Sequence, residues 1–217
     1  MSTADKLTTI AENQQRVYDA GYEKGETAGA KSAYDLFWDS FQANGIARNY
    51  YYAFAYTNWN DTTYNPKYDI IGSTSGSSLR SLFYSSGVTD TKVAIDASKT
   101  TSIQGIFYWA RSLVTVRNLK LGTKVTDTKS AFTDCTQLKN LTVEGDILSN
   151  FDLSYSPLTP ESMKSVISCL KKYAGTSNEF AYTVSFTGAC WAALEADSTA
   201  PDGGTWADYV EKLGWLT

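Results

Sequence analysis

The chain contains no histidine among its 217 residues. This absence excludes a histidine-dependent catalytic triad, and it removes the usual zinc ligand and the usual pH switch. Lys and Arg number 19 against 23 Asp and Glu, which gives a net charge of −4. A nucleic-acid-binding domain normally carries a basic patch, so this charge balance argues against nucleic-acid partners.

Long apolar runs are missing as well. No stretch approaches the roughly 20 apolar residues that cross a membrane. The opening MSTADKLTTIAENQQ also lacks the basic and apolar regions of a secretion signal. We therefore expect a protein without a membrane partner that is made in the cytoplasm of the cell that expresses it.

Cysteine is scarce. Cys135, Cys169 and Cys190 are odd in number and share no metal-ligand spacing. Free, mostly buried thiols are favoured over a disulfide, and we expect neither a metal nor another cofactor. The turn Glu144–Asp146 is a weak calcium candidate, because it lacks the alternating acidic spacing of a dedicated calcium loop.

The sequence is rich in aromatic residues, with 15 Tyr, 9 Phe and 6 Trp, and it repeats a phrase in its middle third. The clearest copy, Ala131–Val143, reads AFTDCTQLKNLTV, and its Phe132 follows Phe83 and Phe107 at steps of 24 and 25 residues. A period of 20–29 residues is typical of a solenoid built from stacked repeats. Three short β-runs would stack into one parallel sheet: Val93–Ile95, Leu119–Leu121 and Leu141–Val143.

The chain divides into four predicted segments. Residues 1–32 form a helical arm for oligomerisation or docking, 33–78 an N-terminal helix and aromatic cap, 79–153 the repeats, and 154–217 a C-terminal α/β cap. The arm carries a short apolar seam followed by glycines at every fourth position, which let two helices approach closely. These residues are Leu7, Ile10, Val17, Gly21, Gly25 and Gly29. A flexible linker explains the glycine stretch equally well.

Both caps have local signals. Aromatic residues alternate over Tyr50–Tyr56, which predicts a strand with one aromatic face. In the C-terminal cap, Thr159 followed by Pro160 marks the start of a helix through Tyr173. A strand is expected at Tyr182–Phe186, and a short helix ending at Gly214 is expected in the last residues.

The Ala131–Val143 phrase resembles the BspA-like leucine-rich repeats of bacterial surface proteins. The resemblance implies that the phenylalanine, the cysteine and the spaced aliphatic residues lie in the core: Phe132, Cys135, Leu138, Leu141 and Val143. The N-terminus and the PKYDI stretch resemble leucine-rich-repeat proteins encoded among the tail and lysis genes of phages and prophages of gut Firmicutes. This second resemblance implies localisation in a virion. We therefore expect a mainly β fold with α caps: a short, irregular leucine-rich-repeat solenoid with a parallel sheet, an N-terminal helical arm and an α/β C-terminal cap.

The aromatic residues are the best candidates for a binding site, because Tyr and Trp stack on sugar rings and dominate protein-binding surfaces. The candidate ligand-binding residues are Tyr108, Trp109, Tyr56, Asn58 and Trp59. Packing of the Tyr50–Tyr56 segment inside the N-terminal cap is the competing interpretation for that segment. The favoured function is a non-catalytic adhesion or receptor-binding module of a phage tail or virion surface, joined into a homo-oligomer by the arm. Its partners would be a bacterial surface glycan or protein and other virion proteins.

Two alternatives are of other classes. One is a structural baseplate or decoration component without a host ligand. The other is a glycan hydrolase, which needs two carboxylates about 5–9 Å apart. Eight carboxylates lie in or between the repeats: Asp61, Asp69, Asp96, Asp127, Asp134, Glu144, Asp146 and Asp152. Nothing in the sequence selects a pair, and solvated turn residues explain them better, so an enzyme is not predicted.

Overall fold

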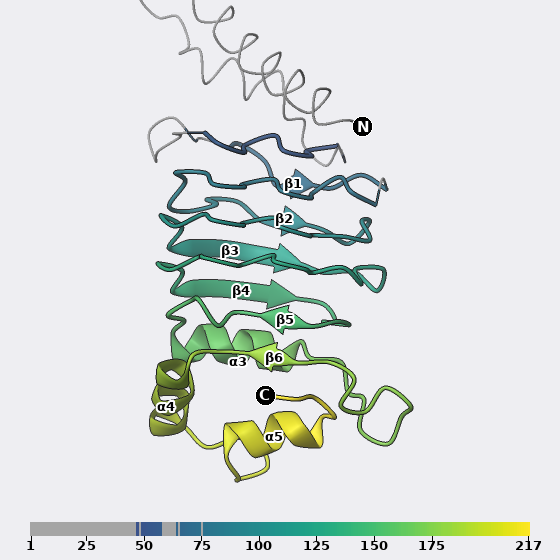
Figure 1. Cartoon of the computed structure of the whole chain (residues 1–217), viewed down its shortest axis with the longest axis vertical. Helices are drawn as coiled ribbons and strands as arrows, with labels where there is room; N and C mark the ends of the chain where they lie inside the picture. The colour runs from purple at the N-terminus through teal and green to yellow at the C-terminus, as the bar shows by residue number, and fades with distance from the viewer. Residues whose placement is uncertain (1–46, 48, 58–63, 65, 75) are drawn as a thin grey trace, which may run out of the picture.

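The computed structural model describes residues 47, 49–57, 64, 66–74 and 76–217 (Figure 1). These residues form six strands and three helices. In chain order they are β1 (Ile70–Ile71), β2 (Ile95–Asp96), β3 (Thr115–Lys120), β4 (Asn140–Glu144), β5 (Phe151–Asp152), α3 (Pro160–Ser168), β6 (Val184–Ser185), α4 (Gly188–Asp197) and α5 (Trp206–Lys212). The longest of these helices, α4, has 10 residues, and no helix in the described part of the chain is long and apolar enough to cross a bilayer.

Four strands form a parallel sheet in the order β1-β2-β3-β4. Ile70, Ile95, Leu119 and Val143 are in register across it, and all four side chains are buried. The predicted β-runs overlap β2 at Ile95 and β3 at its last two residues, and the third lies within β4, so the prediction of a parallel sheet is confirmed. Parallel neighbours need a long connection between them, and here each connection is a non-helical pass of chain along the opposite side of the molecule (Figure 1).

These passes are bonded to one another as regularly as the strands are. We call residues 50–57, 78–86, 102–110 and 127–135 the return segments, and each return segment with the strand that follows it a tier. Phe54 N donates to Leu82 O at 2.9 Å, Phe83 N to Ile106 O at 2.7 Å, and Phe107 N to Ala131 O at 2.9 Å. Successive tiers are therefore held together on both sides of the core.

A column of phenylalanine rings fills the space between the sheet and the return segments. The ring centroids of Phe54, Phe83, Phe107, Phe132 and Phe151 are separated by 5.2, 5.5, 5.4 and 5.4 Å in turn. All five side chains are buried. The three phenylalanines that anchor the sequence repeat are thus the middle of a five-ring column.

The predicted strand at Tyr50–Tyr56 is wrong. Residues 51–56 form consecutive turns, in which Ala53 N donates to Tyr50 O at 2.8 Å and Ala55 N to Tyr52 O at 3.2 Å. Tyr52 and Tyr56 have positive φ angles of 57° and 56°, which interrupt the extended backbone that a strand requires. The segment is a return segment, and Tyr50 and Phe54 are buried in its core while Tyr56 is exposed. The N-terminal helix predicted at the start of the 33–78 segment lies outside the described residues.

Helix α3 covers the open edge of β4. Thr159 caps the helix by accepting from Ser162 N, and Pro160 is its first residue, as predicted; the helix ends at Ser168 rather than at Tyr173. Leu141 N donates to the Ser162 hydroxyl at 2.9 Å, and Val143 N donates to the Ser165 hydroxyl at 2.9 Å. Two serine hydroxyls thus replace the hydrogen bonds that a fifth strand would make, which protects an edge that would otherwise pair with another chain.

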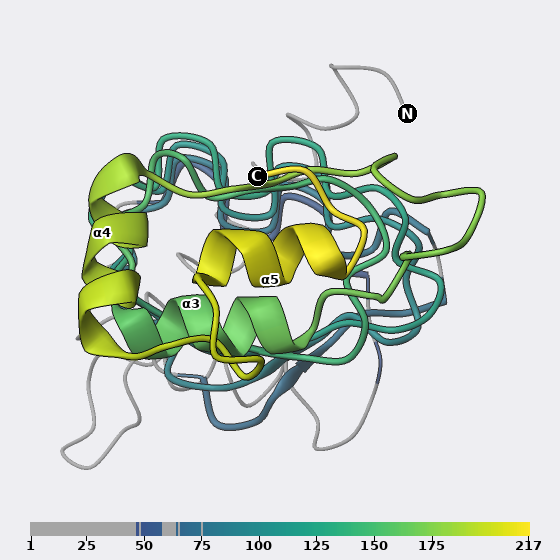
Figure 2. The same ribbon diagram turned by 90° about the horizontal axis from the view of Figure 1, so that it is seen from below.

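The remaining residues close the lower end of the core. Strand β6 pairs with β5 within the predicted Tyr182–Phe186 segment, and Leu216 forms a bridge with Thr183. Helix α4, which the sequence pattern did not indicate, starts at the N-cap Thr187. Seen from below, the tiers overlap as a flattened ring and α5 lies across its middle (Figure 2). The Trp215 side chain is fully buried beside it and donates to Lys171 O at 2.7 Å.

Candidate functional site

The ladder between return segments places the residues that follow the phenylalanines side by side. Phe83 N bonds to Ile106 O and Ser85 N to Tyr108 O, both at 2.7 Å, so Tyr84 and Tyr108 are in register. Residues in register on a parallel ladder project to the same side. The two rings stack, with centroids 5.0 Å apart and planes 24° apart.

Two further rings extend this pair. Tyr56 lies 5.0 Å from Tyr84, and Trp109 lies 5.4 Å from Tyr108, centroid to centroid. We call Tyr56, Tyr84, Tyr108 and Trp109 the aromatic strip. Tyr56 and Trp109, at its two ends, are 56 % and 43 % exposed, whereas Tyr84 and Tyr108 are half-buried. The strip crosses three tiers, so it is a surface feature that no single repeat produces alone.

The backbone of the strip is strained at its two exposed residues. Tyr56 and Trp109 have φ angles of 56° and 60°, in the left-handed region. That conformation costs about 1–2 kcal/mol for a residue with a Cβ, and Gly or Asn adopts it more readily. Large aromatic residues at these positions are therefore not explained by backbone preference. Ser85 and Asp134, at the equivalent positions of the other return segments, have φ angles of 52° and 62°, so this conformation belongs to the return segments themselves.

The strip carries little net charge, because its tyrosine is protonated and its neighbouring arginine is paired. Burial is the main cause that raises the pKa of Tyr84, and the hydrogen bond and negative potential of Tyr56 raise it further. Tyr84 is therefore a neutral phenol at physiological pH. At the Trp109 end, the Arg111 guanidinium lies 5.4 Å from the indole centroid, within the range of a cation–π contact. Arg111 also pairs with Asp134 at 2.7 Å, so its charge is balanced.

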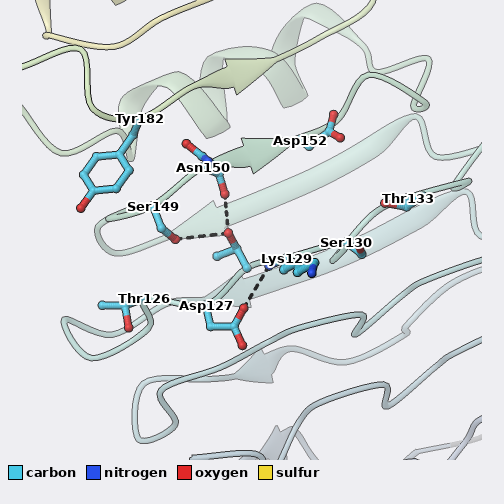
Figure 3. Close-up of a pocket in the computed structure, with 10 residues that line it drawn as sticks. Thr126, Asp127, Lys129, Ser130, Thr133, Ser149, Asn150, Asp152 and Tyr182 are labelled. Carbon is cyan, nitrogen blue, oxygen red and sulfur yellow. Dashed lines mark hydrogen bonds between the residues drawn. The ribbon is translucent and has the colours of Figure 1, made fainter.

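A polar pocket of about 550 Å³ lies on the return segment of the fourth tier, next to β5 (Figure 3). Its lining residues are Thr126, Asp127, Thr128, Lys129, Ser130, Thr133, Ser149, Asn150, Asp152 and Tyr182. The Thr128 hydroxyl donates to Asn150 O and lies 3.2 Å from the Ser149 hydroxyl, which ties the two walls together. Hydroxyl, amide and carboxylate groups line the pocket, with the Tyr182 ring at one end (Figure 3).

Most of the eight carboxylates considered for catalysis bond to backbone or to a basic side chain. Asp127 accepts from the Ser102 hydroxyl at 2.7 Å, and Asp152 accepts from Ser154 N at 3.0 Å. Asp69 and Asp96 accept from Ala94 N and Ser98 N, Asp134 and Asp146 pair with Arg111 and Lys171, and Glu144 accepts from Asn118. Asp61 lies outside the described residues. These contacts are those of turn and surface carboxylates.

Close packing explains why the Glu144–Asp146 turn has a glycine at its centre. A Cβ on Gly145 would lie 2.1 Å from Leu121 O, so only glycine fits there. Among the described residues, no group of three or more His, Cys, Asp and Glu side chains is arranged to hold a metal.

The three cysteines are free, as the sequence predicts. Burial raises the pKa of the Cys135 thiol to about 12, which keeps it protonated and unreactive.

The structure brings three of the five predicted ligand-binding residues together: Tyr56, Tyr108 and Trp109. Asn58 and Trp59 lie outside the described residues, as do the predicted oligomerisation residues Leu7, Ile10, Val17, Gly21, Gly25 and Gly29. Sequence reasoning missed Tyr84, at the centre of the strip. Its signal was present, because Tyr84 follows Phe83 as Tyr108 follows Phe107.

No protein-family model matches the chain, and neither a curated protein sequence nor a solved structure matches it.

Proposed function

We propose that the tiers are the units of a short leucine-rich-repeat solenoid of the BspA-like kind. Three observations support this. The strands follow one another in chain order in a parallel sheet. The repeated phenylalanines form one column. Cys135, which the resemblance places in the core, is buried and its thiol donates to Phe107 O at 3.1 Å.

We further propose that the chain is a non-catalytic adhesion or receptor-binding module of a phage tail or virion surface, and that it recognises a bacterial surface glycan or protein. The observation that carries this proposal is the aromatic strip. Its rings are partly exposed, and they cross three tiers. Contiguous exposed aromatic surface is the usual mark of a partner site.

The test is binding of the fluorescently labelled full chain to a panel of Firmicutes cells, measured by flow cytometry. A Tyr56→Asn/Trp109→Asn variant removes both exposed rings, and asparagine tolerates the left-handed φ, so folding is preserved. Tyr155→Asn is the matched control, because Tyr155 is 45 % exposed and lines neither the strip nor the pocket. We expect the double variant to lose at least about tenfold in apparent affinity, equivalent to about 1.4 kcal/mol. Equal binding by all three proteins would mean that the chain binds cells through another surface and would contradict the role of the strip. No binding by the unaltered chain would favour the structural virion role.

The proposal assigns residues 1–32 to assembly of several copies. The expected result is a dimer or trimer by light scattering for the full chain and a monomer for the variant Leu7→Ser/Ile10→Ser/Val17→Ser. Several copies would add weak sites into strong attachment. Monomers in both samples would contradict the assembly role.

A further inference from the structure

The aromatic strip and the polar pocket are continuous along one row of the molecule. Trp109 N donates to Thr133 O at 2.9 Å, and Phe107 N donates to Ala131 O at the same distance, so Tyr108 and Thr133 are in register. Thr133 lines the pocket. The pocket therefore begins on the tier that directly follows the last tier of the strip.

The same position recurs in three tiers and in strand β5. Tyr84, Tyr108, Thr133 and Asp152 each come directly after a phenylalanine of the core column. We call these four residues the axial row. Since neighbouring parallel strands lie about 4.8 Å apart, the row spans about 15 Å along the stacking direction. Tyr56 at one end and Tyr182 at the other lengthen the surface beyond the row, while Asn150 lies on the same segment as Asp152.

The chemistry changes along this surface in a defined order. At the strip end, rings that overlap one another expose edges and phenol hydroxyls, and ring edges carry partial positive charge that attracts hydroxyl oxygens. At the pocket end, the groups are hydroxyls, an amide and carboxylates (Figure 3). The pocket holds Asp127 and Asp152 against one cation, Lys129, so a neutral ligand fits it better than an acidic one.

We infer that strip and pocket form one binding track for a neutral, linear polysaccharide of β-1,4-linked, gluco-configured sugars that lies along the stacking direction. This inference rests on the proposed function and names the class of ligand. Such a chain is extended and flat, because its linkages and substituents are equatorial. Each sugar advances by a length close to the spacing between tiers, so successive units meet successive residues of the axial row. At the strip end, the ring edges and phenol hydroxyls would contact the sugar hydroxyls, and the hydroxyls of further units would bond in the pocket.

The test measures how affinity depends on the number of sugar units in the oligosaccharide. Isothermal titration calorimetry of the full chain would use β-1,4-linked glucose oligomers and β-1,4-linked N-acetylglucosamine oligomers of two to six units. We expect the hexamer of at least one series to bind about tenfold or more tightly than the dimer, since added units occupy added subsites. Trp109→Asn changes the strip end and Asp152→Asn the pocket end, and each should weaken hexamer binding about fivefold or more. Tyr155→Asn should leave it unchanged.

Three outcomes would overturn the inference. Affinity that is equal for dimer and hexamer would mean a single subsite. Loss of hexamer binding with Trp109→Asn but not with Asp152→Asn would restrict the site to the strip. Absence of binding to both series, while the protein still binds cells through the strip, would point to a protein receptor and leave the proposed function intact. Failure of the proposed function is recognised separately, because the unaltered chain would then bind no cells.

Discussion

The ring column makes a quantitative prediction about stability. Phe107 is fully buried between Phe83 and Phe132, with centroids 5.5 and 5.4 Å away, whereas Phe151 at the column's end contacts the column through Phe132 alone, at 5.4 Å. An aromatic pair contributes about 0.5–1.5 kcal/mol beyond the burial of its area. Leucine keeps most of the burial and loses the ring contacts. Phe107→Leu should therefore lower the free energy of unfolding by about 0.5–1.5 kcal/mol more than Phe151→Leu.

Urea unfolding followed by both circular dichroism and tryptophan fluorescence measures this difference, because the midpoint and slope together give the free energy. A double-mutant cycle supplies the control. Phe83→Leu combined with Phe107→Leu should be non-additive, since the rings touch. Phe83→Leu combined with Phe186→Leu should be additive, because Phe186 contacts Trp191 instead. Equal losses from Phe107→Leu and Phe151→Leu, or additivity in both cycles, would refute the idea that the rings act as a column.

Three other predictions follow from contacts described above. Gly145 and Gly175 both have positive φ, but of the two only Gly145 would place a Cβ against backbone atoms. Gly145→Ala should lower the free energy of unfolding by more than about 3 kcal/mol, and Gly175→Ala should lower it by about 1 kcal/mol. Similar thermal midpoints for the two variants would contradict this prediction. Ser162→Ala removes the acceptor for Leu141 N and the donor to Lys139 O, so it should cost about 1–3 kcal/mol and increase light scattering on heating, while Ser168→Ala, at an exposed serine of the same helix, should do neither. Burial raises the pKa of Cys135 in the folded protein to about 12, so the unfolded chain loses this thiol proton at a lower pH. The free energy of unfolding should therefore fall as pH rises from about 9, by up to about 1.4 kcal/mol per pH unit. The urea midpoint of Cys135→Ala should decline less steeply over that range, and parallel curves for the two proteins would contradict the assignment.

The repeat could be recognised in the sequence where its spacing is regular, and it was missed where the spacing changes. Phe83, Phe107 and Phe132 are 24 and 25 residues apart, whereas Phe54 precedes Phe83 by 29 and Phe151 follows Phe132 by 19. The alternation in Tyr50–Tyr56 indicated a strand, because periodicity alone does not report the positive φ angles that break it. Those angles depend on the bonds that each return segment makes with the next.

The candidate site was predicted in part for a similar reason. Tyr56, Tyr108 and Trp109 were predicted because Tyr and Trp are typical of binding surfaces. The central place of Tyr84 becomes clear only when the tiers are aligned by their backbone hydrogen bonds. The pocket joins Thr126–Thr133 to Asn150 and Tyr182, which are distant in sequence. Their approach depends on α3 and on the return of the chain through β5 and β6, and no local pattern specifies such a path.

The bonds between return segments have a consequence for how the molecule can change. The tiers bond to one another through equivalent backbone positions, and the internal ones repeat after 24 and 25 residues, so we expect an internal tier to be exchangeable as a unit. Duplicating or deleting one internal tier would preserve both ends of the stack while lengthening or shortening the surface between Tyr56 and Asp152. We therefore expect the length of the binding surface to change in steps of one whole tier.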